Sequence, residues 1–179
     1  MRAIELVLRC HAGTAAQRLG HFHRVDEPLS QPPALDPALA GWRCLLAPEL
    51  RVRQTAEGLG LSGEVVDALR DCDLGAWQGQ SLKALQRDAG AALQHWLDDP
   101  HAAPHGGESL HQLQQRVGDW LEHGLGPGRW LAITHPQVIR AAARHVLDLS
   151  FAASQRLDIQ PLGALHLSWY GRWRMRVVG

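Results

Sequence analysis

Four residues have chemically reactive side chains and lie near the ends of predicted strands. Each one either follows an apolar run typical of a strand or lies in the helix after such a run. They are His11, Arg51, Asp71 and His135. An imidazole can act as a nucleophile or a base, a guanidinium binds anions, and a carboxyl group moves protons. A lone histidine after a strand is more often a packing residue, but four reactive side chains at four such positions indicate a site.

The elements that must position these residues alternate along the chain. Short apolar runs predict strands at 3–9, 42–47, 64–69 and 130–134. Helical spacing and capping residues predict helices at 48–59, 81–96, 109–121 and 138–147, with loops at 20–36, 71–79 and 98–107. Ligands of open α/β sheets bind beyond the carboxyl ends of the strands, so the four reactive residues are expected to converge at one rim.

Strand and helix alternation predicts a three-layer α/β/α domain with a mostly parallel mixed sheet. Residues 164–169 and 173–178 alternate in period two around Tyr170-Gly171-Arg172, which predicts an antiparallel hairpin at the C-terminal edge of the sheet. The chain of 179 residues is long enough for one domain with its own core, and we expect a single domain over 1–179.

Composition excludes several classes of function. The chain has 18 basic and 18 acidic residues, and this balance argues against a nucleic-acid partner or a polybasic membrane surface. No stretch has the length of a membrane span. Cys10, Cys44 and Cys72 are widely spaced and odd in number, which fits a reducing compartment. A soluble cytoplasmic protein is therefore expected.

Six segments, in order, resemble the motifs of the histidine phosphatase superfamily in its phosphoglycerate mutase-like branch. They are LRCHAGT (8–14), DEPLS (26–30), APELRVRQTA (47–56), LRDCDLGAWQG (69–79), HGGESL (105–110) and ITHPQVIRAA (133–142). The corresponding family patterns are an Arg-His-Gly turn, Asp-x-Pro-Leu-Thr, Ser-Pro-Leu-x-Arg-Ala-x-Gln-Thr-Ala, a Leu-x-Glu loop closed by Gly-x-Trp-x-Gly, a Gly-Glu-Ser helix start and a second histidine block. The resemblance covers nearly the whole chain.

The resemblance implies a phosphatase that hydrolyses a small phosphorylated metabolite through a phosphohistidine, without a metal or other cofactor. His11 would be the nucleophile, Arg51 and His135 would hold the phosphoryl oxygens, and Asp71 would be the proton donor. The positions expected to bind substrate are Arg9, Cys10, Thr14, Gln17 and Gln137. The oligomeric state does not follow from the sequence.

The sequence departs from the family pattern at positions that bear on activity. Cys10 stands where the family has its first arginine, and Asp71 replaces the commoner glutamate. Ala12, Gln17 and Pro136 stand where glycine, asparagine and glycine are usual. A catalytically silent member that binds a phosphorylated ligand or serves a regulatory role is therefore the alternative. Either Arg9 replaces the missing guanidinium from the same strand, or it caps the strand in solvent.

Two rival chemistries fit the sequence less well. His21, His23, His101 and His105 suggest a metal site, but carboxylate partners at a useful spacing are missing. A thiol nucleophile at Cys10 would have His11 as its neighbour, and adjacent strand residues point to different sides. The segment from 78 to 107 offers only Lys83 and Arg87 as cations, which favours a phosphatase over a mutase.

Overall fold

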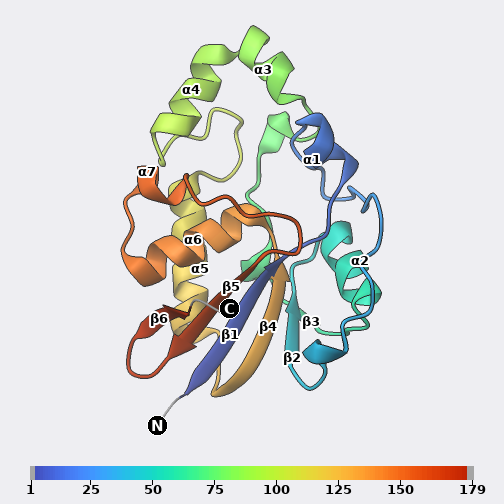
Figure 1. Cartoon of the computed structure of the whole chain (residues 1–179). Helices are drawn as coiled ribbons and strands as arrows, with labels where there is room; N and C mark the ends of the chain where they lie inside the picture. The colour runs from blue at the N-terminus through green and yellow to red at the C-terminus, as the bar shows by residue number, and fades with distance from the viewer. Residues whose placement is uncertain (1–2, 177–179) are drawn as a thin grey trace.

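The computed structural model describes residues 3–176, which form one mixed six-stranded sheet with helices packed around it (Figure 1). The strand order is β3-β2-β4-β1-β5-β6. β3, β2, β4 and β1 are parallel, whereas β5 is antiparallel to β1 and β6 to β5. The strands are β1 (Ile4–Cys10), β2 (Arg43–Leu46), β3 (Glu64–Val65), β4 (Gly128–Thr134), β5 (Ala164–Trp169) and β6 (Trp173–Arg176).

The two central strands are buried on both faces. Val7 and Leu8 point to opposite sides of β1, yet their exposed fractions are 4% and 0%. Leu131, Ala132 and Ile133 of β4 are fully buried as well. Parallel sheets need such cover on both faces, and the mostly parallel sheet with an antiparallel edge confirms the expected α/β fold class.

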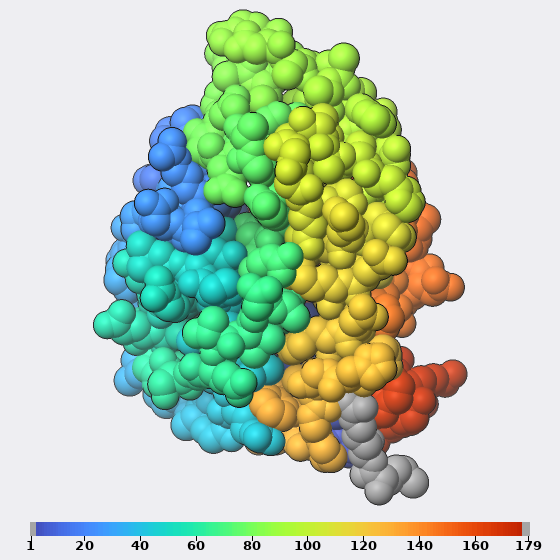
Figure 2. Space-filling view, turned by 180° about the vertical axis from the view of Figure 1, so that it is seen from behind, coloured from blue at the N-terminus to red at the C-terminus, as the bar shows by residue number. Residues whose placement is uncertain are grey.

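The helices are α1 (Ala15–Leu19), α2 (Leu50–Gly58), α3 (Leu82–Asp88), α4 (Gly90–Asp98), α5 (Leu110–His123), α6 (Pro136–Leu147) and α7 (Phe151–Ser154), with short 3₁₀ turns at Pro37–Leu39, Asp67–Leu69 and Gly75–Trp77. α2 contacts β2 and β4, α6 contacts β1 and β6, and α5 packs against α6. Figure 1 shows α3 and α4 beyond the end of the sheet where β1 finishes. Figure 2 shows α5, in yellow, on the opposite side of the molecule from that view.

Capping signals in the sequence start several helices where expected. Ser109 accepts a hydrogen bond from the backbone of Gln112, whose side chain in turn accepts from the backbone of Ser109, so the capping box is confirmed. Ser81 likewise caps α3. The hairpin turn carries Gly171 at φ +84°, a conformation that favours glycine.

Three expectations from the sequence need correction. The strand expected at 64–69 has only two residues, because Asp67–Leu69 turn into a 3₁₀ helix beyond the edge of the sheet. The single helix expected at 81–96 is two helices, since Ala89 leaves the helical region at φ −143°. The short helices α1 and α7 were not anticipated. The last two residues of the expected hairpin strand, 177–178, lie outside the described residues.

Among residues 3–176 there is no helix with the length and apolar character needed to cross a membrane.

Candidate active site

His11 directly follows β1 and is completely buried. Its Nδ1 lies 2.8 Å from the carbonyl oxygen of Ala12, and since a carbonyl only accepts, Nδ1 carries the ring proton. Nε2 therefore has a free lone pair, and it has no hydrogen-bond partner among the described residues. Burial, followed by the positive field of His135, lowers the pKa of His11 to about 3. The ring is thus a neutral imidazole at physiological pH, the form that can attack phosphorus.

Arg51 lies in the first turn of α2 with an exposed fraction of 1%. Its Nη1 donates to the carbonyl oxygen of Arg24 at 2.9 Å. Its Nη2 is 2.6 Å from Asp71 Oδ2 and 3.1 Å from His135 Nδ1. The buried guanidinium thus links three segments of the chain and gives the site a fixed positive charge.

His135 follows β4 and is the N-cap residue of α6. Its Nε2 donates to Glu49 Oε2 at 2.7 Å, and its Nδ1 is 3.5 Å from Asp71 Oδ2. The rings of His135 and His11 have centroids 5.3 Å apart. The hydrogen bond to Glu49 fixes the orientation of His135, with the Nδ1 edge toward Arg51 and Asp71.

Asp71 lies between Arg51 and His135 as a carboxylate. Its Oδ1 accepts from the backbone of Cys72 at 2.9 Å, and its own backbone N–H donates to Glu49 Oε1 at 2.9 Å. Burial would raise the pKa of Asp71, but the charges of His135 and Arg51 outweigh it and hold that pKa well below the usual range. Asp71 is therefore ionised and paired with the guanidinium of Arg51.

A cavity of about 580 Å³ lies beside these groups, but His11 and His135 are completely buried and are not part of its wall. Arg51, Asp71, Gln17 and Gln137 reach its wall. The apolar side chains of the wall include Phe22, Val25, Leu74, Leu82, Trp96 and Ile159. Its charged side chains include Arg24, Arg70, Asp73, Arg140 and Asp158. Arg51 and Asp71 thus open onto a cavity whose wall is partly apolar and partly charged.

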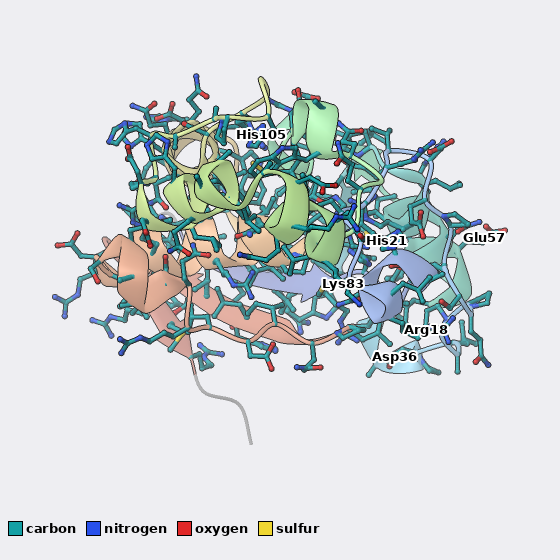
Figure 3. All side chains as sticks on the ribbon, turned by 90° about the horizontal axis from the view of Figure 1, so that it is seen from above. Arg18, His21, Asp36, Glu57, Lys83 and His105 are labelled. Carbon is teal, nitrogen blue, oxygen red and sulfur yellow. The ribbon has the colours of Figure 1, made fainter. Side chains whose placement is uncertain are left out.

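The structure brings most of the sequence-predicted residues together but not Arg9. Thr14 caps α1 and its hydroxyl is 2.8 Å from His23 Nε2, at the edge of the site. Cys10 is buried, and burial raises the pKa of its thiol to about 12, so it stays protonated. Arg9 instead lies 3.8 Å from Asp36, which is at the periphery of the molecule in the view from above (Figure 3). Arg9 is not part of the cavity wall.

Two residues of the site were not singled out for these roles from the sequence. Glu49 stands where the family motif has leucine, and this departure was the available signal. His23 was considered only as a metal ligand, yet its ring lies edge-on to His11 at 5.3 Å and lines the cavity. Burial lowers the pKa of His23 to about 4, so a second neutral imidazole lies against the candidate nucleophile.

Of the other histidines considered as metal ligands, His21 also lines the cavity, whereas His101 and His105 do not. His21 pairs with Ser81 at the start of α3, while His101 stacks on His111 with ring centroids 4.1 Å apart. His105 is buried against Trp77 and Trp96. Within residues 3–176 no three His, Cys, Asp or Glu side chains form a metal-binding group.

Comparison with known proteins places the chain in a family. A model described as histidine phosphatase superfamily (branch 1) matches residues 6–178. The chain belongs to this superfamily. The match confirms the family expected from the six motifs.

Individual relatives agree with this assignment. A mycobacterial structure described as hydrolase 1 is 25% identical, with a TM-score of 0.78 and 98% of both chains covered. The glucosyl-3-phosphoglycerate phosphatase of Mycolicibacterium vanbaalenii is 36% identical over 85 residues, which are 39% of this chain and 38% of that protein. A bifunctional protein of Mycobacterium tuberculosis is 32% identical over 108 residues, 58% of this chain. The chain spans 29% of the length of that relative.

Proposed function

We propose that this protein is a phosphatase that hydrolyses small phosphate monoesters through a phosphohistidine at His11. The observation that carries the proposal is the free lone pair of His11 Nε2, buried in a site that also holds Arg51 and His135. His11 combines a neutral imidazole with a ring nitrogen that has no hydrogen-bond partner among the described residues.

In the first step His11 Nε2 attacks phosphorus and the bond from phosphorus to the alcohol oxygen breaks. Arg51 and His135 hold the phosphoryl oxygens, whose charge is spread over the transition state. Asp71 gives a proton to the departing oxygen. In the second step water attacks the phosphohistidine, Asp71 takes a proton from that water, and inorganic phosphate leaves neutral His11 behind.

The proton that Asp71 delivers must come with the substrate, because Asp71 is ionised in the free protein. A phosphate monoester has a second pKa of about 6 and is partly monoanionic near neutral pH. Binding of the phosphoryl group beside Asp71 engages Arg51 and adds negative charge. Both effects favour movement of the substrate's proton to the carboxylate.

We place the substrate among small phosphorylated metabolites and the protein, as a single domain, in the cytoplasm. The cavity of about 580 Å³ suits a small alcohol, and all three cysteines are free and buried, as in proteins of reducing compartments. Neither nucleic acid nor a membrane is a proposed partner, given the balanced charge. Interconversion of phosphoglycerates is not expected, since hydrolysis needs no second acceptor hydroxyl.

A silent ligand-binding protein is the second candidate, favoured by one observation. Asp71 Oδ2 lies 2.6 Å from Arg51 Nη2, and Cys10 replaces the family's first arginine, so a phosphate meets a guanidinium that is already paired. A screen of aryl and alkyl phosphate monoesters discriminates the two. If the protein is a phosphatase, the wild type and the exposed control variant His123→Ala release phosphate from these esters, whereas His11→Ala does not. A silent protein binds phosphate but releases none with either substrate.

A further inference from the structure

The strand that should carry the first arginine of the family motif provides no guanidinium to the site. Cys10 occupies the motif position, and its thiol is buried. Arg9 extends toward Asp36, outside the cavity wall. Arg51 is the remaining guanidinium at the floor, and its charge is largely offset by Asp71. The proposed reaction therefore lacks one cation unless another element provides it.

Arg140 of α6 has the geometry to fill this gap. Pro136, Gln137 and Arg140 follow His135 along one edge of the first turns of α6, and all three line the cavity. Arg140 Nε donates to the carbonyl oxygen of Leu157 at 2.8 Å, which fixes the guanidinium plane. Within residues 3–176 neither Nη atom has a hydrogen-bond partner or a carboxylate within 4.0 Å. Arg140 thus lines the cavity with two Nη groups that have no partner among the described residues.

α6, which carries Arg140, packs against β1, the strand that ends in Cys10. The charges of Arg51 and Arg140 both act on the Cys10 thiol, so this residue lies within electrostatic reach of both. The nearby Asp158 is on the cavity wall but forms no ion pair with Arg140 among the described residues. Arg140 is half-buried and has no ion pair among the described residues, whereas Arg24 on the same wall is exposed.

We propose that Arg140 on α6 supplies the second phosphoryl-binding guanidinium. Cys10 stands on β1 at the position where the family has its first arginine. Two Nη donors on one planar group match two oxygens of a phosphate, as a lysine ammonium does not. The proposal rests on the phosphoryl site described above. It adds a cation that no strand provides and explains how a site with Cys10 can bind phosphate.

The test measures binding of inorganic phosphate by calorimetry and, separately, ester hydrolysis. Arg140→Gln should raise the Kd for phosphate about 10- to 100-fold and lower kcat about 10²- to 10³-fold. Arg144→Gln is the matched control, because Arg144 lies one turn further on α6, outside the cavity, over the ring of Phe151. It should change both quantities less than about twofold. Arg140→Lys should recover only part of the loss, since it restores charge without the fork.

A complementing variant makes the test specific. Cys10→Arg in the Arg140→Gln background should restore phosphate binding to within a few-fold of the wild-type value, because one guanidinium substitutes for the other. Circular dichroism and the Tm establish that each variant is folded. Should Cys10→Arg prevent folding, the comparison of Arg140→Gln with Arg144→Gln decides alone.

Two outcomes overturn the proposal: unchanged phosphate binding in Arg140→Gln, or loss of binding in Arg24→Gln but not in Arg140→Gln. Failure of the proposed function has a different signature. If wild-type protein hydrolyses no ester, yet Arg140→Gln still loses phosphate binding, the phosphatase assignment falls while Arg140 keeps its role. If wild-type protein hydrolyses esters and Arg140→Gln does so equally well, the inference alone fails.

Discussion

The floor and the mouth of the cavity are built in opposite ways. At the floor, Arg51 lines the cavity and connects to the buried site of His11 and His135, and all three side chains are at most 1% exposed. At the mouth Val25 and Leu82 are 61% and 47% exposed, although both line the cavity. From this difference we infer that the chemical step depends on the buried hydrogen-bonded network. The choice of the alcohol group of the substrate depends instead on the exposed side chains at the mouth. Substitutions at the floor should therefore change mainly kcat, and substitutions at the mouth should change mainly KM.

Replacement of the acid at the floor should have the largest effect. Asp71→Asn should lower kcat for an alkyl phosphate about 10²- to 10⁴-fold, because no proton reaches the departing oxygen. An aryl ester with a good leaving group should lose much less, and inorganic phosphate should bind more tightly, since Arg51 is released. Steady-state kinetics with both esters and calorimetry measure this. Equal losses for the two esters, or the same losses in the exposed control Asp67→Asn, would assign Asp71 a structural role.

The buried neutral histidine of the floor should make stability fall on acidification. The pKa of His11 is about 3 in the fold against 6.5 for an unperturbed histidine, so the unfolded chain binds a proton that the fold does not. This contribution is complete above pH 6.5 and is lost as the pH drops toward 3. The Tm should fall more steeply between about pH 7 and about pH 5 in wild-type protein than in His11→Gln. Parallel curves would mean that His11 is not buried as a neutral ring.

Substitution at the mouth should change substrate affinity and leave the chemistry intact. Leu82→Asn should raise KM for aryl and long alkyl phosphates by about three- to tenfold, since it removes apolar contact with the alcohol. The Kd for inorganic phosphate and kcat should stay within about twofold. Leu97→Asn is the control, because Leu97 is similarly exposed, at 45%, but lies off the cavity wall. A fall in kcat without a change in KM would place Leu82 with the floor.

The smallest effect is expected outside both regions, at Arg9. Its ion pair with Asp36 at 3.8 Å lies near the surface, and such pairs contribute about 0–1 kcal/mol. Arg9→Gln should lower the Tm slightly and change kcat/KM less than about twofold. A loss comparable to that of Arg140→Gln would show that Arg9 turns into the site when substrate binds.

The sequence predicted the fold well wherever local patterns coincide with tertiary burial. The apolar runs of β1 and β4 and the capping box at Ser109 are local signals that packing reinforces. Agreement fails at the edges. The run at 64–69 is β-branched, but it lies at the exposed end of the sheet and pairs with β2 through two residues only. The break at Ala89 is followed by Gly90, the signal that was available for it.

The candidate site was likewise predicted where local patterns in the sequence are informative, and missed where they are not. Strand ends and motif spacing placed His11, Arg51, Asp71 and His135, and the structure brings these four together. Strand ends and motif spacing did not single out Glu49, His23 or Arg140, because the contacts of these side chains depend on which distant groups they meet after folding. A buried carboxylate beside His135 or an unpaired guanidinium beside Cys10 is a property of the packed structure, not of the spacing along the chain.

The most direct measurement is to trap the covalent intermediate. Wild-type protein is mixed with a phosphate monoester, quenched within the first turnovers under alkaline conditions that preserve phosphohistidine, and digested for peptide mass spectrometry. The account predicts one phosphoryl group on the peptide that contains His11, and none in Asp71→Asn turning over an alkyl ester or in His11→Gln. Rapid phosphate release with no phosphorylated peptide, or a phosphoryl group on His23 or His135 instead, would contradict it.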